Sequence, residues 1–370
     1  MTIPLLKVFM SNEAPEAAAQ VLTSGYIGQG PMVEEFETLL RSHFTSDYVA
    51  TVNSGTSALH LALRLIADMP GDEVLTTPLT CTATNWPILA NNMRIKWVDV
   101  DPQSCNMDIE DLRKKISHRT KAVMVVHWGG QPIDLDLLRK TVLEFSNPNQ
   151  PIPVIEDCAH AFGSYYKGRP VGSHGNYACF SFQAIKLVTT VDGGAIITPT
   201  METYKRAKLL RWYGIDREVP LLDMRCELDV PEWGYKFHMN DVAAAIGKCN
   251  VKHWRRLAAI QYENSGYYDE VLVNVPGLTL LSRNPDYKSS CWLYTLRAKN
   301  RDGLMRRLRE NGIMSSRVHE RNDKHTCVRQ FQEYLPQLDA LVSDMLCIPV
   351  GWWVTHEDRE LIARTIMQGW

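Results

Sequence analysis

The sequence lacks the features that mark several large classes of protein. Its 370 residues contain no run of the roughly 18 apolar residues that a membrane-spanning helix needs. The nine cysteines are scattered and none forms a CxxC pair, so neither a disulfide framework nor a structural zinc site is indicated. The formal charge is −2 without a basic block, which disfavours binding to nucleic acid. We therefore expect a cytoplasmic protein with reduced cysteines, no metal, and neither membrane nor nucleic acid as a partner.

Two further absences narrow the function. The pattern GxxxxGK[ST] does not occur, which disfavours a P-loop nucleotide hydrolase. The glycine pair at positions 193 and 194 is too short for a dinucleotide fingerprint, and the N-terminal apolar stretch is too short for a signal sequence. The chain also has no internal repeat and no low-complexity segment.

From about residue 48 the sequence alternates short β-branched runs with segments of helical length. KAVMVVHW, for example, precedes IDLDLLRKTVLEFSN. This alternation predicts parallel strands joined by helices, with both faces of the sheet covered. Near residue 250 a long helical pattern begins, and strand and helix patterns follow it. We expect a large α/β domain over residues 1–250 and a smaller α+β domain over residues 251–370, entered by a long helix.

Lys186 stands between the strand-like run ACFSF and the glycine pair. Burial in an apolar pocket lowers the pKa of a lysine, because desolvation disfavours the charged form. A neutral amine is a nucleophile for carbonyl groups, so the position favours Schiff-base chemistry. The alternative is a lysine whose head group reaches solvent from the end of a strand.

Other polar residues follow strands of the same predicted sheet, at the edge where ligands bind in such folds. Asp157 ends the run PIPVIED, where a carboxylate could keep a pyridine nitrogen protonated. SGTS, residues 54–57, lies between a strand and a helix, where free N–H groups favour a phosphate. A plain helix cap is the alternative there. Ser181 offers a further hydroxyl to the phosphate or is an ordinary strand-end serine. With Lys186, these residues indicate a pyridoxal phosphate site.

The chain resembles the DegT/DnrJ/EryC1/StrS family of sugar aminotransferases, which use pyridoxal 5′-phosphate and have the aspartate aminotransferase fold. The similar segments cover nearly the whole chain and are SGYIGQGPMVEEFE (24–37), NSGTSALHLAL (53–63), residues 155–196, LLRWYGIDR (209–217) and WGYKFHMNDVAAAIG (233–247). The resemblance implies a mainly parallel central sheet flanked by helices, fold type I, with a smaller C-terminal α+β domain.

The resemblance also implies roles for single residues. Lys186 would form the Schiff base, Asp157 would pair with the pyridine nitrogen, and His160 would lie beside the cofactor ring and its phenolic oxygen. These three form the expected catalytic set, although His160 could instead be a core histidine satisfied by backbone. The expected cofactor-binding set is Gly55, Thr56, Ser57, Cys81, Asp157, His160, Ser181, Lys186, Lys236 and His238.

Two positions depart from the family pattern. Cys81 stands where the family commonly offers an aromatic side chain to the cofactor ring, so either its thiol packs on the ring or Trp86 does. The family often has GYNxR where this chain has GYKFH, so Lys236 or His238 would replace the usual asparagine and arginine. Because that loop resembles the one donated by the neighbouring subunit, we expect a homodimer with shared active sites.

The resemblance implies ping-pong transamination from L-glutamate to a nucleotide-linked 4-keto-6-deoxy sugar, with a 3-keto sugar as the alternative. In a family relative that removes a sugar hydroxyl, a histidine replaces the lysine, so Lys186 favours amination. Arg317 and Arg321 would bind the diphosphate or would be solvated arginines on a loop. The expected substrate-binding set is Tyr26, Gln29, Gly30, Arg211, Arg317, His319 and Arg321.

Two other function classes stay open on the sequence. One is a different pyridoxal phosphate reaction on an amino acid, such as that of a desulfurase or an aldolase. The other is a sensor that keeps the fold and the cofactor without turnover. An absorbance band that bleaches with glutamate and returns only with a keto-sugar nucleotide would favour transamination over both.

Overall fold

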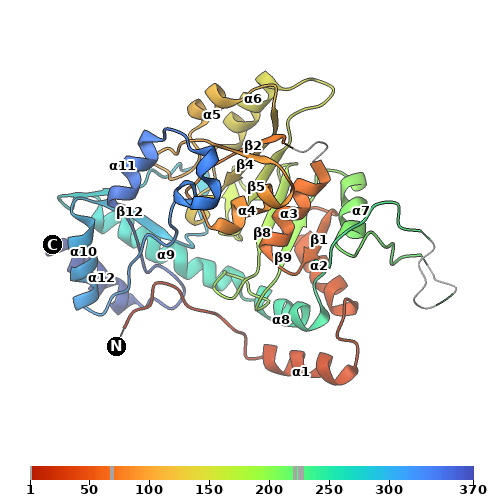
Figure 1. Cartoon of the computed structure of the whole chain (residues 1–370). Helices are drawn as coiled ribbons and strands as arrows, with labels where there is room; N and C mark the ends of the chain where they lie inside the picture. Colours follow the sequence, from red (N-terminus) through yellow and green to blue (C-terminus); the bar gives the residue numbers. More distant parts are fainter. Residues whose placement is uncertain (1, 67–70, 220–222, 224–228) are drawn as a thin grey trace.

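The computed structural model describes residues 2–66, 71–219, 223 and 229–370. At its centre lies a seven-stranded sheet (Figure 1). The spatial order of its strands is β1 (Val49–Val52), β9 (Gly194–Ile197), β8 (Tyr177–Ser181), β5 (Val154–Asp157), β4 (Thr120–Val126), β2 (Glu73–Thr76) and β3 (Arg94–Trp97). Neighbours from β8 to β3 pair in parallel, whereas β9 is antiparallel to both β8 and β1. The predicted mainly parallel sheet is therefore confirmed.

Helices cover both faces of this sheet (Figure 1). Alternate residues of β4 enter two separate hydrophobic clusters, Val123 and Val125 in one and Met124 in the other. Burial on both faces explains why its sequence is continuously apolar rather than alternating. The helices of this part are α2 (Pro31–Phe44), α3 (Gly55–Ile66), α4 (Thr82–Ala90), α5 (Ile109–Lys115), α6 (Leu135–Phe145), α7 (Met201–Leu210) and α8 (Asp241–Val251), with the 3₁₀ turn η1 (Trp128–Gly130).

Polar side chains mark where several of these helices begin. Asp134 accepts a hydrogen bond from the N–H of Leu137 at the start of α6, and Asn240 accepts one from the N–H of Ala243 at the start of α8. Such caps satisfy amides that have no acceptor within the helix. Short polar residues thus fix where α6 and α8 begin.

The long helix α9 (Trp254–Leu272) leads into a second region with its own hydrophobic cluster. Its antiparallel sheet has the order β10 (Leu278–Leu280), β12 (Tyr294–Ala298) and β13 (Met345–Ile348). The remaining elements are α10 (Arg301–Glu310), η2 (Asn322–Lys324), η3 (Thr326–Phe331), α11 (Pro336–Asp344) and α12 (His356–Met367). This region has the α+β composition that the sequence predicts after residue 250.

Backbone pairing is among the contacts that tie the regions together. The strand β11 (Tyr287–Lys288) pairs with β6 (Tyr165–Tyr166), which in turn pairs with β7 (Arg169–Pro170). Ile3 forms a bridge with Ile313, so the first residues lie beside the C-terminal region. The boundary at residue 250 stays a prediction.

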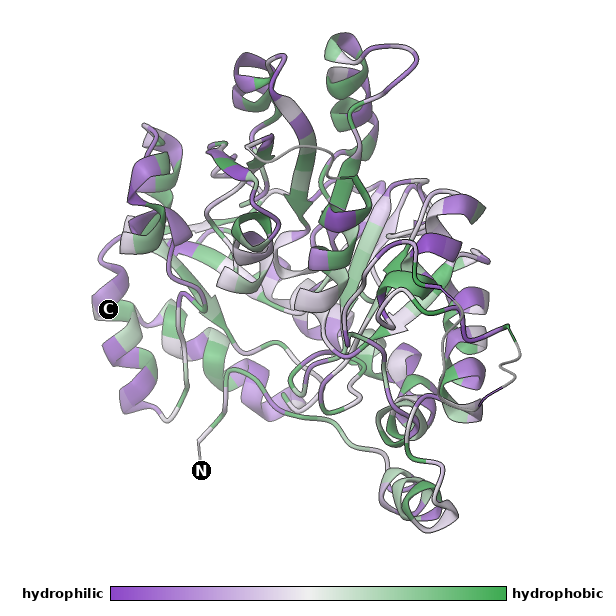
Figure 2. Ribbon diagram, turned by 45° about the vertical axis from the view of Figure 1, so that its right-hand side comes forward, coloured by the Kyte–Doolittle hydropathy of each residue, from purple (hydrophilic) through white to green (hydrophobic). Residues whose placement is uncertain are grey.

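The helix α1 (Ala14–Ser24) lies at the edge of the molecule, against α8 (Figure 1). Figure 2 shows hydrophobic residues gathered in the central strands and hydrophilic residues spread over the surrounding helices. Among the helices of the described ranges, none is both long enough and apolar enough to span a bilayer.

Candidate active site

A cavity of about 410 Å³ lies beyond the carboxyl ends of β4, β5 and β8. Ligands bind at this edge in open α/β sheets, which is where the sequence places its candidate residues. The cavity is lined by eight of those candidates, namely Gly55, Thr56, Cys81, Asp157, His160, Ser181, Lys186 and His319. The strand ends thus bring together residues that are far apart in the chain.

Lys186 lies in the turn between β8 and β9, with its backbone N–H donating to the carbonyl of Gln183 at 2.9 Å. Burial lowers the pKa of the amine to about 8, although the carboxyl of Asp157 and the thiol of Cys81 act in the opposite direction. A pKa of about 8 leaves roughly a tenth of the amine neutral at pH 7, and this neutral form is the nucleophile for carbonyl groups.

Asp157 is the last residue of β5, and its carboxylate is buried. Oδ2 accepts a hydrogen bond from Thr84 Oγ1 at 2.7 Å, and Oδ1 accepts one from the N–H of Ala159 at 3.0 Å. Burial nevertheless raises the pKa of this carboxyl group, outweighing those two hydrogen bonds. Within the described ranges, the carboxylate forms no ion pair. A buried carboxylate in this state fits a ligand that brings a positive charge.

His160 is buried, with 5% of its surface exposed, and lines the same cavity. Its Nδ1 accepts a hydrogen bond from the N–H of Gly129 at 3.3 Å, which leaves the ring hydrogen on Nε2. Burial, and then the amine of Lys186, lower the pKa of this imidazole well below its usual value. His160 is thus a neutral hydrogen-bond donor at the wall of the cavity.

His319 belongs to the C-terminal region and lies parallel to His160, with ring centroids 5.9 Å apart. Burial, and then the amine of Lys186, lower its pKa to about 4. Its Nε2 has no hydrogen-bond partner among the described residues. Of the seven predicted substrate-binding residues, it is the one that lines the cavity.

The first turn of α3 forms one wall of the cavity. A Cβ on Gly55 would lie 2.8 Å from Cβ of Ser181, so a glycine is needed for the start of α3 to approach the end of β8 this closely. The first amides of a helix have no intrahelical acceptor and favour an anion. Ser57 differs from the prediction, because its hydroxyl donates to Asn53 Oδ1 at 2.6 Å and its N–H to Ser54 Oγ at 3.0 Å. Its side chain does not line the cavity.

The two candidates for stacking on a cofactor ring are separated by the structure. Cys81 precedes α4 and lines the cavity. Trp86 does not line it and packs edge-on against His325, with ring centroids 5.7 Å apart. An aromatic ring that the sequence did not single out, Trp292, does line the cavity.

Lys236 and His238 lie outside the cavity of their own chain, around the indole of Trp212. The distance from Lys236 Nζ to a ring centroid of Trp212 is 4.7 Å, and that from Arg217 Cζ is 4.5 Å. Burial, and then the nearby cations, lower the pKa of His238 to about 4. Lys236 and Arg217 thus place two positive charges near one indole, outside the cavity that holds this chain's own Lys186, whereas the lowered pKa leaves His238 neutral.

Two predicted substrate-binding arginines need correction. Arg211 is only 2% exposed, and its Nη1 donates to Glu37 Oε1 at 2.6 Å and to the carbonyl of Thr51 at 2.8 Å. Arg321 is 7% exposed and is paired with Asp323 and Asp339. Because both guanidinium groups already have buried acceptors, neither is free to bind a diphosphate.

The other substrate-binding candidates also lie elsewhere. Arg317 pairs with Glu320 at 2.9 Å, and the N–H of Gly30 donates to Asp241 Oδ1 at 2.7 Å. The carbonyl of Gln29 accepts from Arg217 at 3.2 Å. Tyr26 is 80% exposed and borders a second cavity of about 750 Å³ between α1, α2 and α8. None of them lines the cavity of Lys186.

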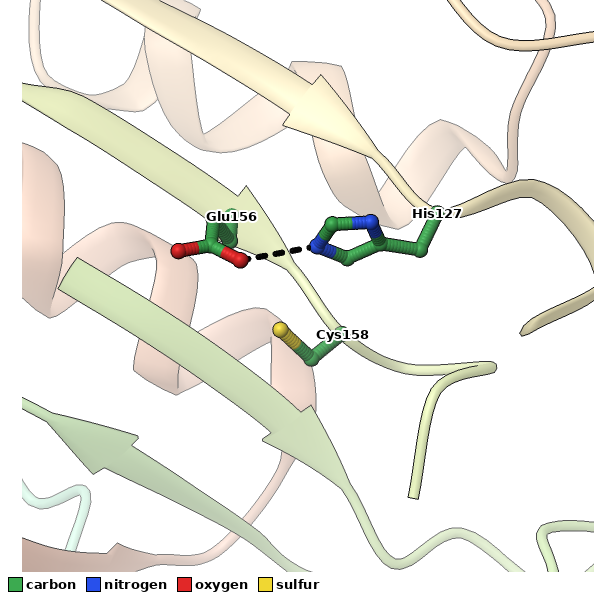
Figure 3. Close-up of side chains that lie close together, drawn as sticks. All are labelled: His127, Glu156 and Cys158. Atoms are coloured by element: carbon green, nitrogen blue, oxygen red, sulfur yellow. Dashed lines mark hydrogen bonds and ion pairs between the residues drawn. The ribbon is translucent and has the colours of Figure 1, made fainter. Parts of the chain in front are cut away.

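A second polar group, formed by His127, Glu156 and Cys158, lies near the same strand ends (Figure 3). His127 Nδ1 accepts from the N–H of Ile133 at 3.2 Å, so its ring hydrogen is on Nε2 and points to Glu156 Oε2 at 2.9 Å. Both ring nitrogens are therefore occupied. We interpret this buried pair as structural.

Comparison with known proteins agrees with this geometry. A model of the DegT/DnrJ/EryC1/StrS aminotransferase family matches residues 9–367. AtS13 from Actinomadura melliaura is 47% identical, with a TM-score of 0.96 and a match covering 100% of this chain and 99% of that chain. The sugar aminotransferase CalS13 from Micromonospora echinospora is 44% identical, with a TM-score of 0.97 and full coverage of both chains, 100%.

A curated relative is more distant in sequence. The UDP-4-amino-4-deoxy-L-arabinose–oxoglutarate aminotransferase of Shewanella sediminis (strain HAW-EB3) is 33% identical over 324 residues. The match covers 84% of this chain and 81% of that protein. The family match over nearly the whole length, together with these likenesses, shows that the chain belongs to the DegT/DnrJ/EryC1/StrS aminotransferase family.

Proposed function

We propose that the protein is a pyridoxal 5′-phosphate-dependent aminotransferase that transfers an amino group from L-glutamate to a nucleotide-linked 4-keto-6-deoxy sugar. The observation that carries this proposal is a single cavity with two groups. One is the amine of Lys186, whose pKa is lowered, and the other is the buried carboxylate of Asp157, which forms no ion pair within the described ranges. The relative from Shewanella sediminis is named for a UDP-linked amino sugar and oxoglutarate, which supports a nucleotide sugar and the keto acid that corresponds to glutamate.

The residues that line the cavity fit this cofactor. The amides of Gly55 and Thr56, with the hydroxyl of Ser181, would hold the phosphate at the N-terminus of α3. Asp157 would face the ring nitrogen, and His160 would lie at the phenolic oxygen. When bound, the cofactor supplies an electron sink and an aldehyde that bonds to Lys186.

The chain's own residues would then accept the α-carbon proton of L-glutamate and stabilise the positive charge on the ring nitrogen. The neutral Nζ of Lys186 accepts the proton from the α-carbon of L-glutamate, and a pKa of about 8 suits a general base near neutral pH. The carboxylate of Asp157 would stabilise a proton on the ring nitrogen, and the protonated nitrogen would be the cationic partner of this buried carboxylate. His160 Nε2–H donates a hydrogen bond that fixes the ring.

His319 is our candidate for contact with the keto sugar. Its Nε2 is unpartnered among the described residues and the side chain lines the cavity, so it can form a hydrogen bond with a sugar hydroxyl or carbonyl. The neutral ring, with a pKa of about 4, can donate at one nitrogen and accept at the other.

We also propose a homodimer in which Lys236 and His238 serve the cavity of the neighbouring subunit. The support is that both residues lie outside the chain's own cavity, where Lys236 and the nearby Arg217 carry positive charge. A cationic loop of this kind matches the charge of a cofactor phosphate. If the loop crosses over, a mixed dimer of a Lys186→Ala chain and a Lys236→Ala chain should contain one complete site and regain about half of the activity of an unaltered dimer.

The experiment that tests the proposed function follows the cofactor's visible absorbance. Protein loaded with pyridoxal 5′-phosphate should bleach on addition of L-glutamate and regain its absorbance with one member of a panel of keto-sugar nucleotides. Recovery with a 3-keto sugar alone would correct the position of amination. A band that never responds to glutamate would reject transamination.

A further inference from the structure

Trp292 reaches the candidate site from the C-terminal region. It lies just before β12 and follows Cys291, whose φ of +53° makes a sharp left-handed turn. Its side chain is 5% exposed and lines the cavity of about 410 Å³. Among the described lining residues, only Val318 and His319 also follow residue 250. A bulky ring from the second region thus closes one side of a site built by the first.

The indole is fixed by bonds to the residues around Lys186 and His160. Its Nε1–H donates to the carbonyl of Ile185, the residue before Lys186, at 3.0 Å. The neighbouring hydroxyl of Ser290 donates to the carbonyl of His160 at 2.6 Å. The ring therefore keeps a defined position relative to both side chains.

Gly130 permits this close approach of the two regions. A Cβ at that position would lie 2.0 Å from Ser290 Oγ and 2.8 Å from the carbonyl of His160. Its φ of +92° also favours glycine. The segment that carries Trp292 packs into the space left by the missing side chain.

The amine of Lys186 lies over the indole. The distance from Nζ to a ring centroid of Trp292 is 3.8 Å, which is a close cation–π contact. In the part of the chain that the structure describes, this Nζ makes neither a hydrogen bond nor an ion pair. The ring of His160 stacks on the same indole at 3.9 Å between centroids, with planes 21° apart.

An aromatic face suits an amine that must alternate between a bonded and a free state. The face attracts an ammonium group but has no atom that can accept its proton. A carboxylate at hydrogen-bond distance would instead hold the amine in its charged form. The indole can therefore keep the amine in place while leaving it free to gain or lose a proton.

We propose that Trp292 is a positioning residue whose ring receives the Lys186 amine whenever that amine is not bonded to the cofactor. This inference rests on the proposed function, in which the amine of Lys186 would be free of the cofactor from the arrival of L-glutamate until the aminated sugar leaves. The ionisable groups that line the cavity with the amine are Cys81, Asp157, His160, Asp192 and His319. The test leaves all five unchanged.

The test compares Trp292→Phe with Trp292→Leu in the full chain freed of cofactor, so it does not depend on turnover. The two replacements leave similar space for water, but only phenylalanine keeps an aromatic face. Competitive labelling with an amine reagent over a range of pH, read on the peptide that contains Lys186, gives the pKa of that amine. We expect a pKa about 0.5–1 unit lower in the leucine variant than in the phenylalanine variant. Equal values would overturn the proposal.

A second measurement uses the unaltered protein. After ¹³C reductive methylation, the Lys186 methyl signal should lie upfield of those of exposed lysines, because it sits in the ring current of the indole. Trp86→Leu, outside the cavity, should leave that shift unchanged. A signal at the position of an exposed lysine would overturn the role of Trp292. If the Trp292 proposal fails in this way but borohydride still traps the cofactor on Lys186, the proposed function stands. Absence of the trapped adduct would reject the function itself.

Discussion

Glu156 and Asp157 are neighbours on β5, both buried, yet their carboxylates have opposite pKa shifts. Burial acts to raise the pKa of each. At Glu156 the hydrogen bonds from His127 and Asn176 outweigh burial, and the pKa lies below its usual value. At Asp157 burial prevails over the bonds from Thr84 and Ala159, and the pKa lies above its usual value.

The difference separates a structural carboxylate from a functional one. Successive residues of a strand point to opposite faces, so Glu156 meets a closed group of protein donors while Asp157 meets the cavity. The first is satisfied by the chain itself. The carboxylate of Asp157 lacks a compensating positive charge, which a cationic ligand would supply. Buried groups with a shifted pKa of this kind are typical of functional sites.

The largest effect is expected on the cavity side, from Lys186→Ala. Loss of the amine removes both the covalent link to the cofactor and the base, so turnover should fall by roughly 10⁴-fold or more. Absorbance spectra and borohydride trapping followed by mass spectrometry measure the link. The fold should persist, since a buried amine is lost and no ion pair is broken.

The matched control for that variant is Lys252→Ala. Lys252 lies on the surface, where Nζ pairs with Glu13 at 2.8 Å, and its loss should leave both absorbance and turnover unchanged. Amination that survives in the Lys186→Ala protein would remove Lys186 from the chemistry.

Asp157→Asn should have the next largest effect on activity. The amide keeps the shape of the side chain but no longer stabilises a proton on the ring nitrogen, so the cofactor becomes a poorer electron sink. We expect cofactor to bind and turnover to fall on the order of 10²- to 10³-fold. Steady-state rates with L-glutamate measure the loss, and rates within a few-fold of the unaltered protein would contradict the role.

Much of the candidate site could be predicted from the sequence. Asp157 and Lys186 follow apolar strand-like runs, and the carboxyl ends of parallel strands meet at one edge of the sheet. That rule is enough to place both side chains in one cavity, together with Gly55 and Ser181. The α/β class follows from the same alternation of patterns.

The remainder depends on contacts between distant residues. Arg211 and Arg321 resemble free cations in the sequence, but Glu37 and Asp339 pair with them in the fold. Trp292 stands in an apolar run that predicts only a strand, and the contact that brings it to Lys186 joins two regions of the chain. The sequence pattern does not predict which charged side chain is paired with a distant residue, or which aromatic ring contacts the other region.

On the core side of β5, Glu156→Gln should reduce stability rather than activity. It weakens hydrogen bonds to a charged acceptor, so the free energy of unfolding should fall by about 1.5–3 kcal/mol. Because the folded pKa lies below the unfolded value of about 4.3, the stabilisation is complete above that value and is lost as pH falls through the folded pKa. Urea unfolding at several pH values measures both the loss of unfolding free energy and its dependence on pH.

The control for this variant is Glu144→Gln, whose carboxylate pairs with Arg113 at the surface. A surface ion pair contributes about 0–1 kcal/mol, so this change should be smaller and reduced further by salt. If Glu156→Gln is as stable as the unaltered protein, the buried pair with His127 is not what holds the strand ends together.

We expect the smallest effect in the stability of cofactor-free Asp157→Asn. The raised pKa of Asp157 means that the folded state binds the proton more tightly than the unfolded state, so the stability of the unaltered protein falls as pH rises through the interval between the two pKa values. The asparagine side chain does not titrate, so the variant does not lose this stability as pH rises. Its stability relative to the unaltered protein should therefore improve from acid to neutral pH, by about 1 kcal/mol. Glu156→Gln should show the opposite trend over the same interval, because it loses a carboxylate whose folded pKa is lowered. Parallel trends in the two variants would mean that the neighbouring carboxylates do not differ in the way the cavity implies.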